Sequence, residues 1–407
     1  MNTPISALAW ALAGLSALAF TVAVARPLRL PVWGSMAVAL VLRVAFAAVT
    51  SQKFTPRDVR VYFRRTAVLV GRGEDPARHL PGREWNFLPL MPYVHFVELR
   101  TGWPWVYAVK IAPIAADVVV VWLVSRLARS DGERRALQYA LNPVSLFVAA
   151  LHGQVEPVAL ALGLGGMLLA GRGRWFGGGL LLGAAVAAKS WPALLVLAAL
   201  PLADLRRDFQ LIVRLLAGTV VTVLAVLVSG VILLDSRPSE LVHVISYTSY
   251  VGTWGWAALL ILNGVPRIVG YNSRVGRLGA VLTAAAAVAV VVLLRRRDMQ
   301  ARGLAVLSTF LIVTAGFGVQ YLLWPVPLLI AVGSWSRIPY VLLAGVYTAV
   351  TYLIQLPYGY PLARMAALSL LVIAALIGVL VDAARQPRGP GPRQPHQPGV
   401  CLSLLVT

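Results

Sequence analysis

Residues 54–98 read FTPRDVRVYFRRTAVLVGRGEDPARHLPGREWNFLPLMPYVHFVE, the longest polar interruption in an otherwise apolar chain. This stretch holds five of the fifteen acidic residues. Thr55 and Pro56 suit the N-cap and the first position of a helix, and Asp58 follows Thr55 at the spacing of a capping box. Apolar residues then recur at helical spacing, while the arginines fall on another face. The stretch therefore predicts an amphipathic helix lying at a membrane surface.

Composition decides what surrounds that helix. Of the 407 residues, 59% are hydrophobic and only 13% are charged, and the mean hydropathy is +0.78. A soluble domain carries about 25% charged residues. We therefore expect an all-α, polytopic membrane protein with about 11–13 transmembrane helices, judged by the length of apolar residues that crosses a bilayer. The formal charge of +21 comes from arginines between apolar spans, which favours contact with anionic lipid and no nucleic-acid partner.

The distribution of arginines predicts which loops face which side. Arg26 and Arg29 lie in the short connector after the first span, which the positive-inside rule assigns to the cytoplasm. The loop at residues 51–104 then lies outside. Residues 177–202 read as a broken pair of helices with Lys189 at its outward tip. We expect one transmembrane catalytic domain at residues 1–383, including that external loop, and a disordered, basic cytoplasmic tail at residues 384–407.

Polar residues converge on the outward side of this topology. Charged and polar groups inside membrane proteins face a cavity or one another, because exposure to lipid is costly. The sequence thus predicts a site that opens at the outer leaflet, within reach of a lipid headgroup. The residues that map to outward helix ends or external loops are Asp58, His95, the turn at 152–156, Lys189, His243, Tyr250, Gln320, Tyr321 and Tyr358.

Several short motifs, taken in order, carry a family resemblance over residues 30–335. They are Arg57-Asp58-Val59-Arg60-Val61-Tyr62-Phe63, Asp75-Pro76, Asn86-Phe87-Leu88-Pro89, Lys110-Ile111-Ala112-Pro113, Leu141-Asn142-Pro143, His152-Gly153-Gln154-Val155-Glu156, Lys189-Ser190-Trp191-Pro192 and Gln320-Tyr321-Leu322-Leu323-Trp324-Pro325. With these motifs the chain resembles the GT-C class of polyprenol-phosphate-sugar-dependent glycosyltransferases. Within that class it is similar to the bacterial polyprenol-phosphate-mannose-dependent mannosyltransferases of the cell envelope. The first loop lacks the doubled acid that is frequent in that family, which leaves metal dependence and the donor sugar open.

The resemblance implies transfer of a hexose, mannose first, from a polyprenyl phosphate to a lipid or glycan acceptor on the outer face of the plasma membrane. Such a reaction needs a base for the acceptor proton and cations for the leaving phosphate. We expect no cofactor, since a lipid phosphate leaves as a stable anion; a divalent metal is compatible with the reaction but is not required. Asp58 is the candidate base. The candidate cations at the donor phosphate are Arg60, Arg65, Lys189 and His152. The candidate substrate-binding residues are Tyr62, Tyr93, Gln154, Glu156, Gln320, Tyr321 and Trp324.

Other interpretations stay open at this point. A polyprenyl-phosphate arabinose or glucose transferase fits the same motifs, because no residue pattern identifies the sugar hydroxyls. A transporter or flippase of lipid-linked sugars also has many spans and a broken helix pair. A structural partner without catalysis is the third alternative. At the residue level, Asp58 can be a helix cap, Lys189 a snorkelling cation, and Arg43 a buried ion-pair member whose partner the sequence does not identify.

Overall fold

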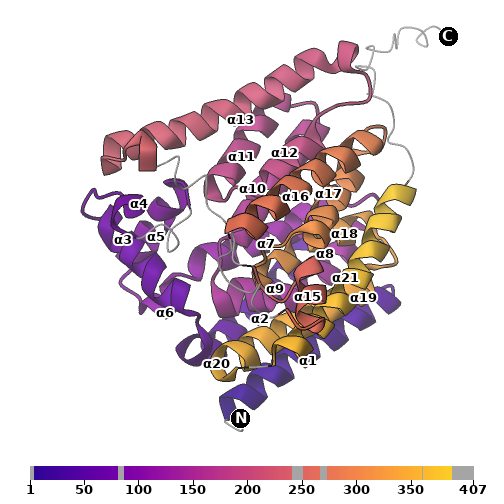
Figure 1. Ribbon diagram of the computed structural model, residues 1–407. Helices are drawn as coiled ribbons and strands as arrows, with labels where there is room; N and C mark the ends of the chain where they lie inside the picture. The colour runs from indigo at the N-terminus through magenta and orange to yellow at the C-terminus, as the bar shows by residue number, and fades with distance from the viewer. Residues whose placement is uncertain (1–3, 81–86, 241–250, 266–272, 360, 387–407) are drawn as a thin grey trace, which may run out of the picture.

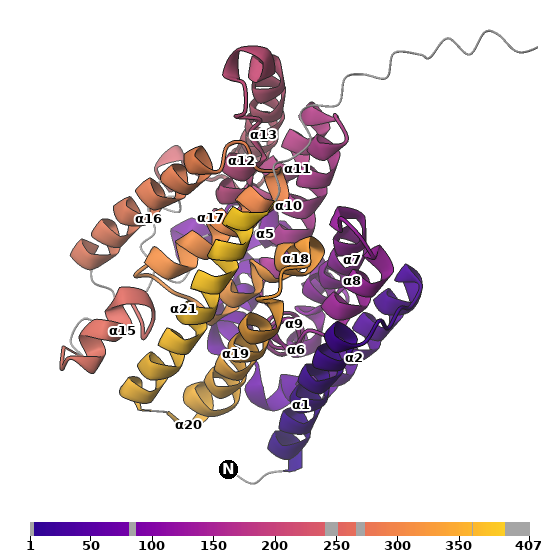
Figure 2. The same cartoon turned by 90° about the vertical axis from the view of Figure 1, so that its right-hand side faces the viewer.

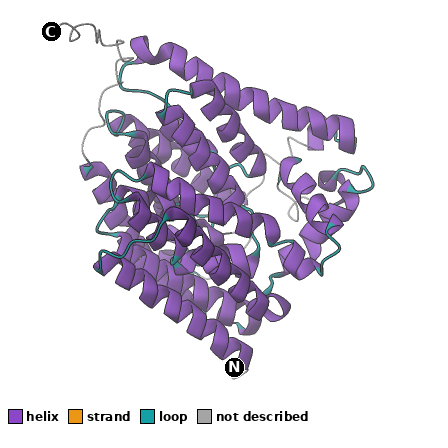
Figure 3. Cartoon of the chain, turned by 180° about the vertical axis from the view of Figure 1, so that it is seen from behind, coloured by secondary structure: helices purple, strands orange, loops and turns teal. Residues whose placement is uncertain are grey.

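The computed structural model describes residues 4–80, 87–240, 251–265, 273–359 and 361–386. Most of these residues are helical, and the described part contains no named strand; Val251 and Gly316 form an isolated bridge (Figure 3). The expectation of an all-α protein is confirmed. The predicted tail at residues 384–407 lies almost wholly outside the described residues, as do His243 and Tyr250.

The first half of the chain supplies the helices around Asp58. Its helices are α1 Pro4–Ala25, α2 Val32–Phe54, η1 Asp58–Phe63, α3 Arg64–Val70, α4 Pro76–His79, α5 Leu90–Arg100, α6 Trp105–Ala108, α7 Ile111–Leu127, α8 Gly132–Ala140, α9 Pro143–Ser145, η2 Leu146–His152, α10 Glu156–Gly171, α11 Trp175–Ala188 and α12 Ala193–Ala199. The expected broken pair at residues 177–202 is present as α11 and α12, which are separated at Lys189.

The second half adds longer outer helices and a short central one. Its helices are α13 Leu205–Leu234, α15 Gly255–Leu262, α16 Ser273–Leu293, α17 Met299–Val313, η4 Val319–Leu323, α18 Val326–Val332, α19 Arg337–Val350, η5 Thr351–Gln355, α20 Leu356–Tyr358 and α21 Leu362–Arg385. Seven stretches of the described chain are long and apolar enough to cross a membrane, and five shorter apolar helices accompany them. The polytopic expectation is confirmed.

Nine of the helices form a closed ring in which each packs against the next. The order around the ring is α1, α2, α7, α10, α11, α12, α17, α21 and α19, and α19 packs back against α1 (Figures 1 and 2). Inside lie η2 and α18, and every residue of η2 is buried. The long helix α13 covers α11 from outside, and only 11% of its most apolar window is buried. Lipid is the natural solvent for such an exposed apolar surface.

A buried ion pair joins two helices of the ring. Arg43 of α2 lies 2.8 Å from the Asp117 carboxylate of α7, and both side chains are fully buried. Tyr139 and Ser145 also donate hydrogen bonds to Asp117, and Arg43 donates to the Ala140 carbonyl oxygen. The partner of Arg43 is therefore Asp117, and the network closes a charge pair that bare hydrocarbon would not tolerate.

The two ends of the ring differ in charge. At one end, which we call the Asp58 end, α2 and α11 finish and α7 and α10 begin. The opposite end, which we call the basic end, contains Arg29, Arg129, Arg134, Arg174 and Arg297. Arg29 lies 2.6 Å from Asp131 there, and Arg129 pairs with Asp298. The arginines of the short connectors thus lie at the end that Asp58 does not occupy, while Arg57, Arg60, Arg64 and Arg65 lie in the segment around Asp58.

Candidate active site

Asp58 is the second residue of the helical segment that follows α2. The Thr55 hydroxyl donates back to the Ser51 carbonyl oxygen at 2.6 Å, so Thr55 finishes the preceding helix instead of capping the next one. The predicted capping box is therefore wrong: the helix begins at Arg57, and no side chain caps it. The amphipathic prediction is confirmed, since Val59 and Phe63 are buried and Arg60 and Arg64 are exposed. Asp58 is left free for contacts across the bundle.

The turn after η2 holds the Asp58 carboxylate. His152 Nε2 lies 3.1 Å from Asp58 Oδ2, and Gln154 Nε2 donates to the same oxygen at 3.0 Å. Gly153 between them has φ +78°, and a Cβ there would lie 3.0 Å from Lys110 Cγ. Lys110 in turn donates to the Leu151 carbonyl oxygen at 2.6 Å. A glycine and a buried lysine thus fix the turn that carries both partners of Asp58.

Tyr352 completes a chain of three polar side chains. Its hydroxyl lies 2.5 Å from His152 Nδ1, and its ring meets the imidazole edge to face at 5.2 Å. The Tyr352 hydroxyl and the Asp58 carboxylate thus hold the two ring nitrogens of His152, one on each side. Sequence reasoning missed Tyr352, because it lies inside an apolar segment that reads as an ordinary span. Its one sequence signal is its position, less than two helical turns before Tyr358, which the sequence places at an outward helix end or in an external loop.

The environment keeps Asp58 ionised. Burial raises the pKa of its carboxyl, but the charge and hydrogen bond of His152, the Val59 backbone N–H and the charge of Lys189 together bring that pKa below its ordinary value. The Asp58 side chain is nevertheless 38% exposed, whereas His152 is 6% exposed. Asp58 is thus a carboxylate with one side fixed by protein and the other open to a bound molecule.

A buried ion pair lies near Asp58. Lys189 Nζ is 2.5 Å from Glu156 Oε1, and Lys189 also lies over the rings of Phe87 and Tyr321, at 5.4 and 5.5 Å from their centroids. The second oxygen of Glu156, Oε2, is buried without a hydrogen-bond partner among the described residues. Cation–π contacts and a carboxylate together stabilise the Lys189 charge in a setting with little water.

Aromatic rings continue the site from Lys189. Trp191 stacks on Trp324 with centroids 4.2 Å apart, and Tyr321 packs on Trp324 at the same centroid distance. Both indole nitrogens are buried without an acceptor within the described part of the chain. Gln320 lies in the same short helix as Tyr321. Rings of this kind bind the apolar faces of sugars, and indole N–H groups donate to hydroxyl oxygens.

Three predicted site residues have side-chain hydrogen-bond partners outside this cluster. Arg60 donates to the Gln52 carbonyl oxygen at 2.9 Å, and Arg65 donates to the His79 carbonyl oxygen at 3.4 Å. Tyr93 donates to Ser229 of α13 at 3.1 Å. Tyr62, which was also predicted, is half-buried in η1. The structure thus joins Asp58, His152 and Gln154 by direct contacts, and joins Glu156, Lys189, Tyr321 and Trp324 in a neighbouring cluster.

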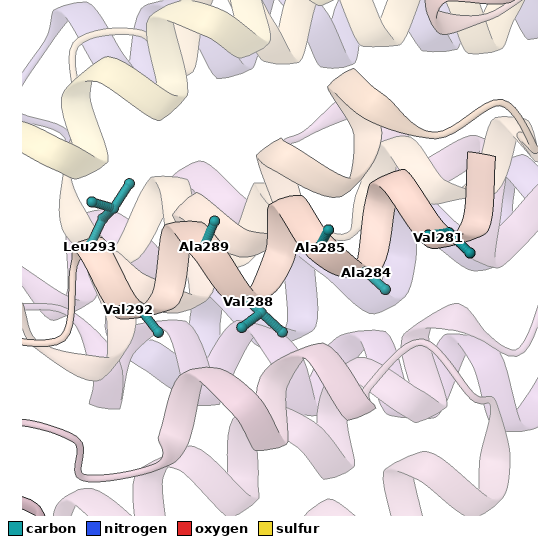
Figure 4. Close-up of a pocket in the computed structure, with 7 residues that line it drawn as sticks. All are labelled: Val281, Ala284, Ala285, Val288, Ala289, Val292 and Leu293. Carbon is teal, nitrogen blue, oxygen red and sulfur yellow. The ribbon is translucent and has the colours of Figure 1, made fainter. Parts of the chain in front are cut away.

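Two further features of the described residues bear on ligands. No three His, Cys, Asp or Glu side chains in the described ranges are grouped so that they could hold a metal ion. A shallow apolar groove of about 860 Å³ runs along α16, and Figure 4 shows its lining side chains on that single helix. They are Val281, Ala284, Ala285, Val288, Ala289, Val292 and Leu293. This groove has no part in the Asp58 site.

Comparison with models of protein families identifies a family for this chain. The model of glycosyltransferase family 87 matches residues 90–325, which is more than half of the chain. No curated protein matches the chain. The matched range includes His152, Gln154, Glu156, Lys189 and Trp324, whereas Asp58 precedes it.

Proposed function

Starting from the fact that this chain belongs to glycosyltransferase family 87, we propose that it transfers mannose from a polyprenyl-phosphate donor to a glycolipid or glycan acceptor. The observation that carries the proposal is the Asp58 carboxylate, which His152 and Gln154 hold on one side while 38% of the side chain stays exposed. A positioned, ionised and accessible carboxylate is what a general base for an acceptor hydroxyl requires.

The proposed reaction needs no cofactor to account for the bonds and the proton. Asp58 takes the proton of the acceptor hydroxyl as its oxygen bonds to the anomeric carbon, and the bond to the phosphate oxygen breaks with its electron pair. The products are the glycosylated acceptor and a polyprenyl phosphate, and the proton remains on Asp58. Attack from the face opposite the phosphate inverts the anomeric centre, by analogy with inverting glycosidases. Because a lipid phosphate is a stable leaving group, the proposal requires no metal ion.

Side chains around Asp58 divide the remaining tasks. Lys189 is our main candidate for the charge that develops on the phosphate, with Arg60 and Arg65 on the exposed face of the first loop as further candidates. Both ring nitrogens of His152 already have protein partners. We therefore propose that His152 positions Asp58, and that Lys189, Arg60 and Arg65 bind the donor phosphate.

The sugar itself is assigned to the aromatic side of the site. We propose that the half-buried Tyr321 packs on the sugar ring with the buried Trp324 supporting it from behind, and that Gln320 and Gln154 bind the sugar hydroxyls. The unpartnered Glu156 Oε2 would accept a hydroxyl hydrogen bond. This assignment leaves arabinose and glucose as rival donors, because ring stacking does not read the orientation of each hydroxyl.

The arrangement of charge supports an outward-facing site in the plasma membrane. The basic end of the ring is the end that the positive-inside rule assigns to the cytoplasm, and Asp58 lies at the other end. We therefore propose that donor and acceptor meet on the periplasmic side.

The decisive experiment is transfer of radiolabelled mannose by membranes that contain the wild type or Asp58→Asn. The amide keeps the shape of the carboxylate but cannot take the proton, so we expect transfer to fall about 10²-fold or more. Glu133→Gln is the matched control, because it removes an exposed carboxylate from the basic end of the molecule.

Each outcome has a distinct meaning. Full activity of Asp58→Asn would remove Asp58 as the base. A wild type that transfers no mannose would be assayed with arabinose and glucose donors, and activity with one of these would change only the sugar. Expression and thermal melting of every variant are measured in parallel, so that loss of the fold is not mistaken for loss of the base.

A further inference from the structure

Three arginines crowd around one turn at the basic end. Arg134 and Arg135 belong to α8, and Arg337 begins α19 directly after the turn at Gly333 and Ser334. Arg337 donates to the Gly333 and Ser334 carbonyl oxygens at 2.6 and 2.5 Å. Gly333 has φ +78°, and a Cβ on it would lie 2.4 Å from Arg135 Nη2. Two guanidinium groups therefore meet at a single glycine, and the positive φ of this glycine would strain any larger residue at the same position.

The carboxylate that contacts the turn of this cluster bonds to other groups: Asp382 accepts hydrogen bonds from the Ser334 hydroxyl and the Ser336 backbone N–H. No acidic side chain within the described residues forms an ion pair with Arg134, Arg135 or Arg337. Asp131 acts on Arg135 electrostatically, but its carboxylate pairs with Arg29 at 2.6 Å. Burial, followed by the charge of Arg134, lowers the pKa of Arg135. Like charges thus lie close together in a partly buried setting, which costs free energy unless an anion joins them.

Most of the hydrogen-bond donors of the cluster remain unused. Each guanidinium has five N–H donors. Arg134 donates to the Val24 carbonyl oxygen at 2.6 Å, and Arg135 donates to Gln138 Oε1 at 3.1 Å. The Nε atoms of all three arginines are buried and have no partner among the described residues. Capping of the last turn of α1 explains the one bond of Arg134, and the bonds of Arg135 and Arg337 likewise use only one terminal nitrogen of each guanidinium.

The surroundings indicate where the acceptor comes from. Trp335 lies in the same turn and is 66% exposed, and Trp33 at the start of α2 is 75% exposed at this end of the bundle. Exposed tryptophans mark the headgroup region of a bilayer. Leu28, in the connector between α1 and α2, is 45% exposed. The cluster therefore lies at the level where lipid phosphates are found.

We propose that Arg134, Arg135 and Arg337 bind the phosphate of an anionic phospholipid at the end of the molecule opposite Asp58. The planar forks of arginine match phosphate oxygens in pairs, which explains why three arginines occur where one or two would suffice for topology. The bound lipid bridges α8 and α19, and through Arg134 it is also linked to the end of α1. This proposal is independent of the reaction at Asp58.

The test measures lipid-dependent stability and not activity. The purified full chain in an uncharged detergent is titrated with phosphatidylglycerol, phosphatidylcholine or inorganic phosphate, and its melting temperature is followed. We expect phosphatidylglycerol to raise the melting temperature of the wild type. In Arg135→Gln/Arg337→Gln, the concentration needed for half the effect should increase about tenfold or more, since each charge-assisted hydrogen bond contributes about a factor of ten.

The control removes the same charge from the same end. Arg172→Gln/Arg174→Gln changes two exposed arginines in the turn between α10 and α11, and should titrate like the wild type. Equal titration curves for the two double variants would overturn the site. Equal effects of phosphatidylcholine would overturn the requirement for an anionic lipid, and a full shift with inorganic phosphate would replace the lipid with a soluble anion. If the double variant does not fold, Arg135→Gln alone is titrated, with the same expected direction.

Discussion

Asp58 is one end of a chain of contacts that runs from the Tyr352 hydroxyl through the His152 ring to a carboxylate oxygen. Two opposing effects act on that carboxylate. Burial raises its pKa, and His152 is the first of the groups that lower it. Because the net pKa lies below the ordinary value of 3.8, Asp58 is ionised at every pH at which the protein is expected to work.

His152→Gln isolates the electrostatic part of this arrangement. Glutamine can still donate a hydrogen bond, but it carries no charge. Because burial raises the pKa of Asp58 and the opposing charge is gone, that pKa should rise. The acidic limb of the kcat/KM profile, which reports the base of the free enzyme, should then move to higher pH. A merely structural role of His152 would lower the rate without moving that limb. The measurement is a pH profile of sugar transfer by the wild type, His152→Gln and the control His79→Gln, whose ring is 40% exposed.

The lowered pKa of Asp58 also makes the stability of the fold depend on pH. A carboxyl whose folded pKa is depressed adds stability above its unfolded pKa, and this contribution is lost as the pH falls through the lower, folded value. The contribution of Asp58 is thus complete at neutral pH and disappears only below about pH 4. Since the side chain is 38% exposed, solvent screening reduces its size.

Individual residues show how far the sequence could predict the site. The outward mapping of polar groups correctly brought Asp58, His152 and Gln154 to one end, because span length and arginine position are local properties. Thr55 was misassigned, because its hydroxyl bonds backward to Ser51 and spacing alone does not distinguish the two directions. The Tyr352 contact depends on two helices that are 200 residues apart in sequence, which no local pattern encodes.

At the level of elements, the three residues of the Asp58 chain share an unusual backbone. Asp58 lies in η1, His152 in η2 and Tyr352 in η5, and all three segments are π-helical. A π turn is wider than an α turn and occurs often at functional sites. It rotates the side chains that follow it relative to those that precede it. Sequence periodicity is calibrated on α turns and so could not predict these segments.

The contact between α2 and α7 is the clearest target for a stability experiment. Arg43→Met leaves the buried Asp117 carboxylate without its cation, and we expect a loss of about 3–5 kcal/mol in unfolding free energy. Arg43→Met/Asp117→Leu removes both charges and should recover most of that loss.

Thermal or denaturant unfolding of the purified protein measures this cycle. Arg29→Met is the control, because its pair with Asp131 is largely exposed and should matter little. If the double variant is less stable than Arg43→Met, the loss in Arg43→Met is not explained by the unpaired Asp117 charge alone.

For the whole molecule, the separation of the Asp58 end from the basic end supports the proposed orientation in the membrane. The helices α2 and α11 end and the helices α7 and α10 begin at the Asp58 end, so their other ends lie toward the basic end. The all-α, polytopic architecture and the broken pair at Lys189 were predictable from the sequence. The closed ring was not, since it depends on contacts such as α19 with α1 that join distant parts of the chain.

Thiol labelling tests the sidedness directly. The chain has one cysteine, Cys401, so Cys401→Ser provides a background without thiols. In that background, Arg64→Cys introduces a thiol on the exposed face of α3, and Arg174→Cys introduces one at the basic end. We expect a membrane-impermeant maleimide to label Arg64→Cys in intact cells and Arg174→Cys only after the cells are opened. The reverse pattern would put Asp58 in the cytoplasm.

The π turns also suggest how such a site can arise and be lost. A helix that gains a single residue can keep both of its ends in place by widening one turn, so the surrounding packing survives an insertion that would otherwise shift the whole element. Removing one residue from η1, η2 or η5 should restore an α turn and rotate the neighbouring side chains by about 100°. One-codon deletions at these three segments are therefore expected to preserve a folded membrane bundle that has lost the contact between Tyr352, His152 and Asp58.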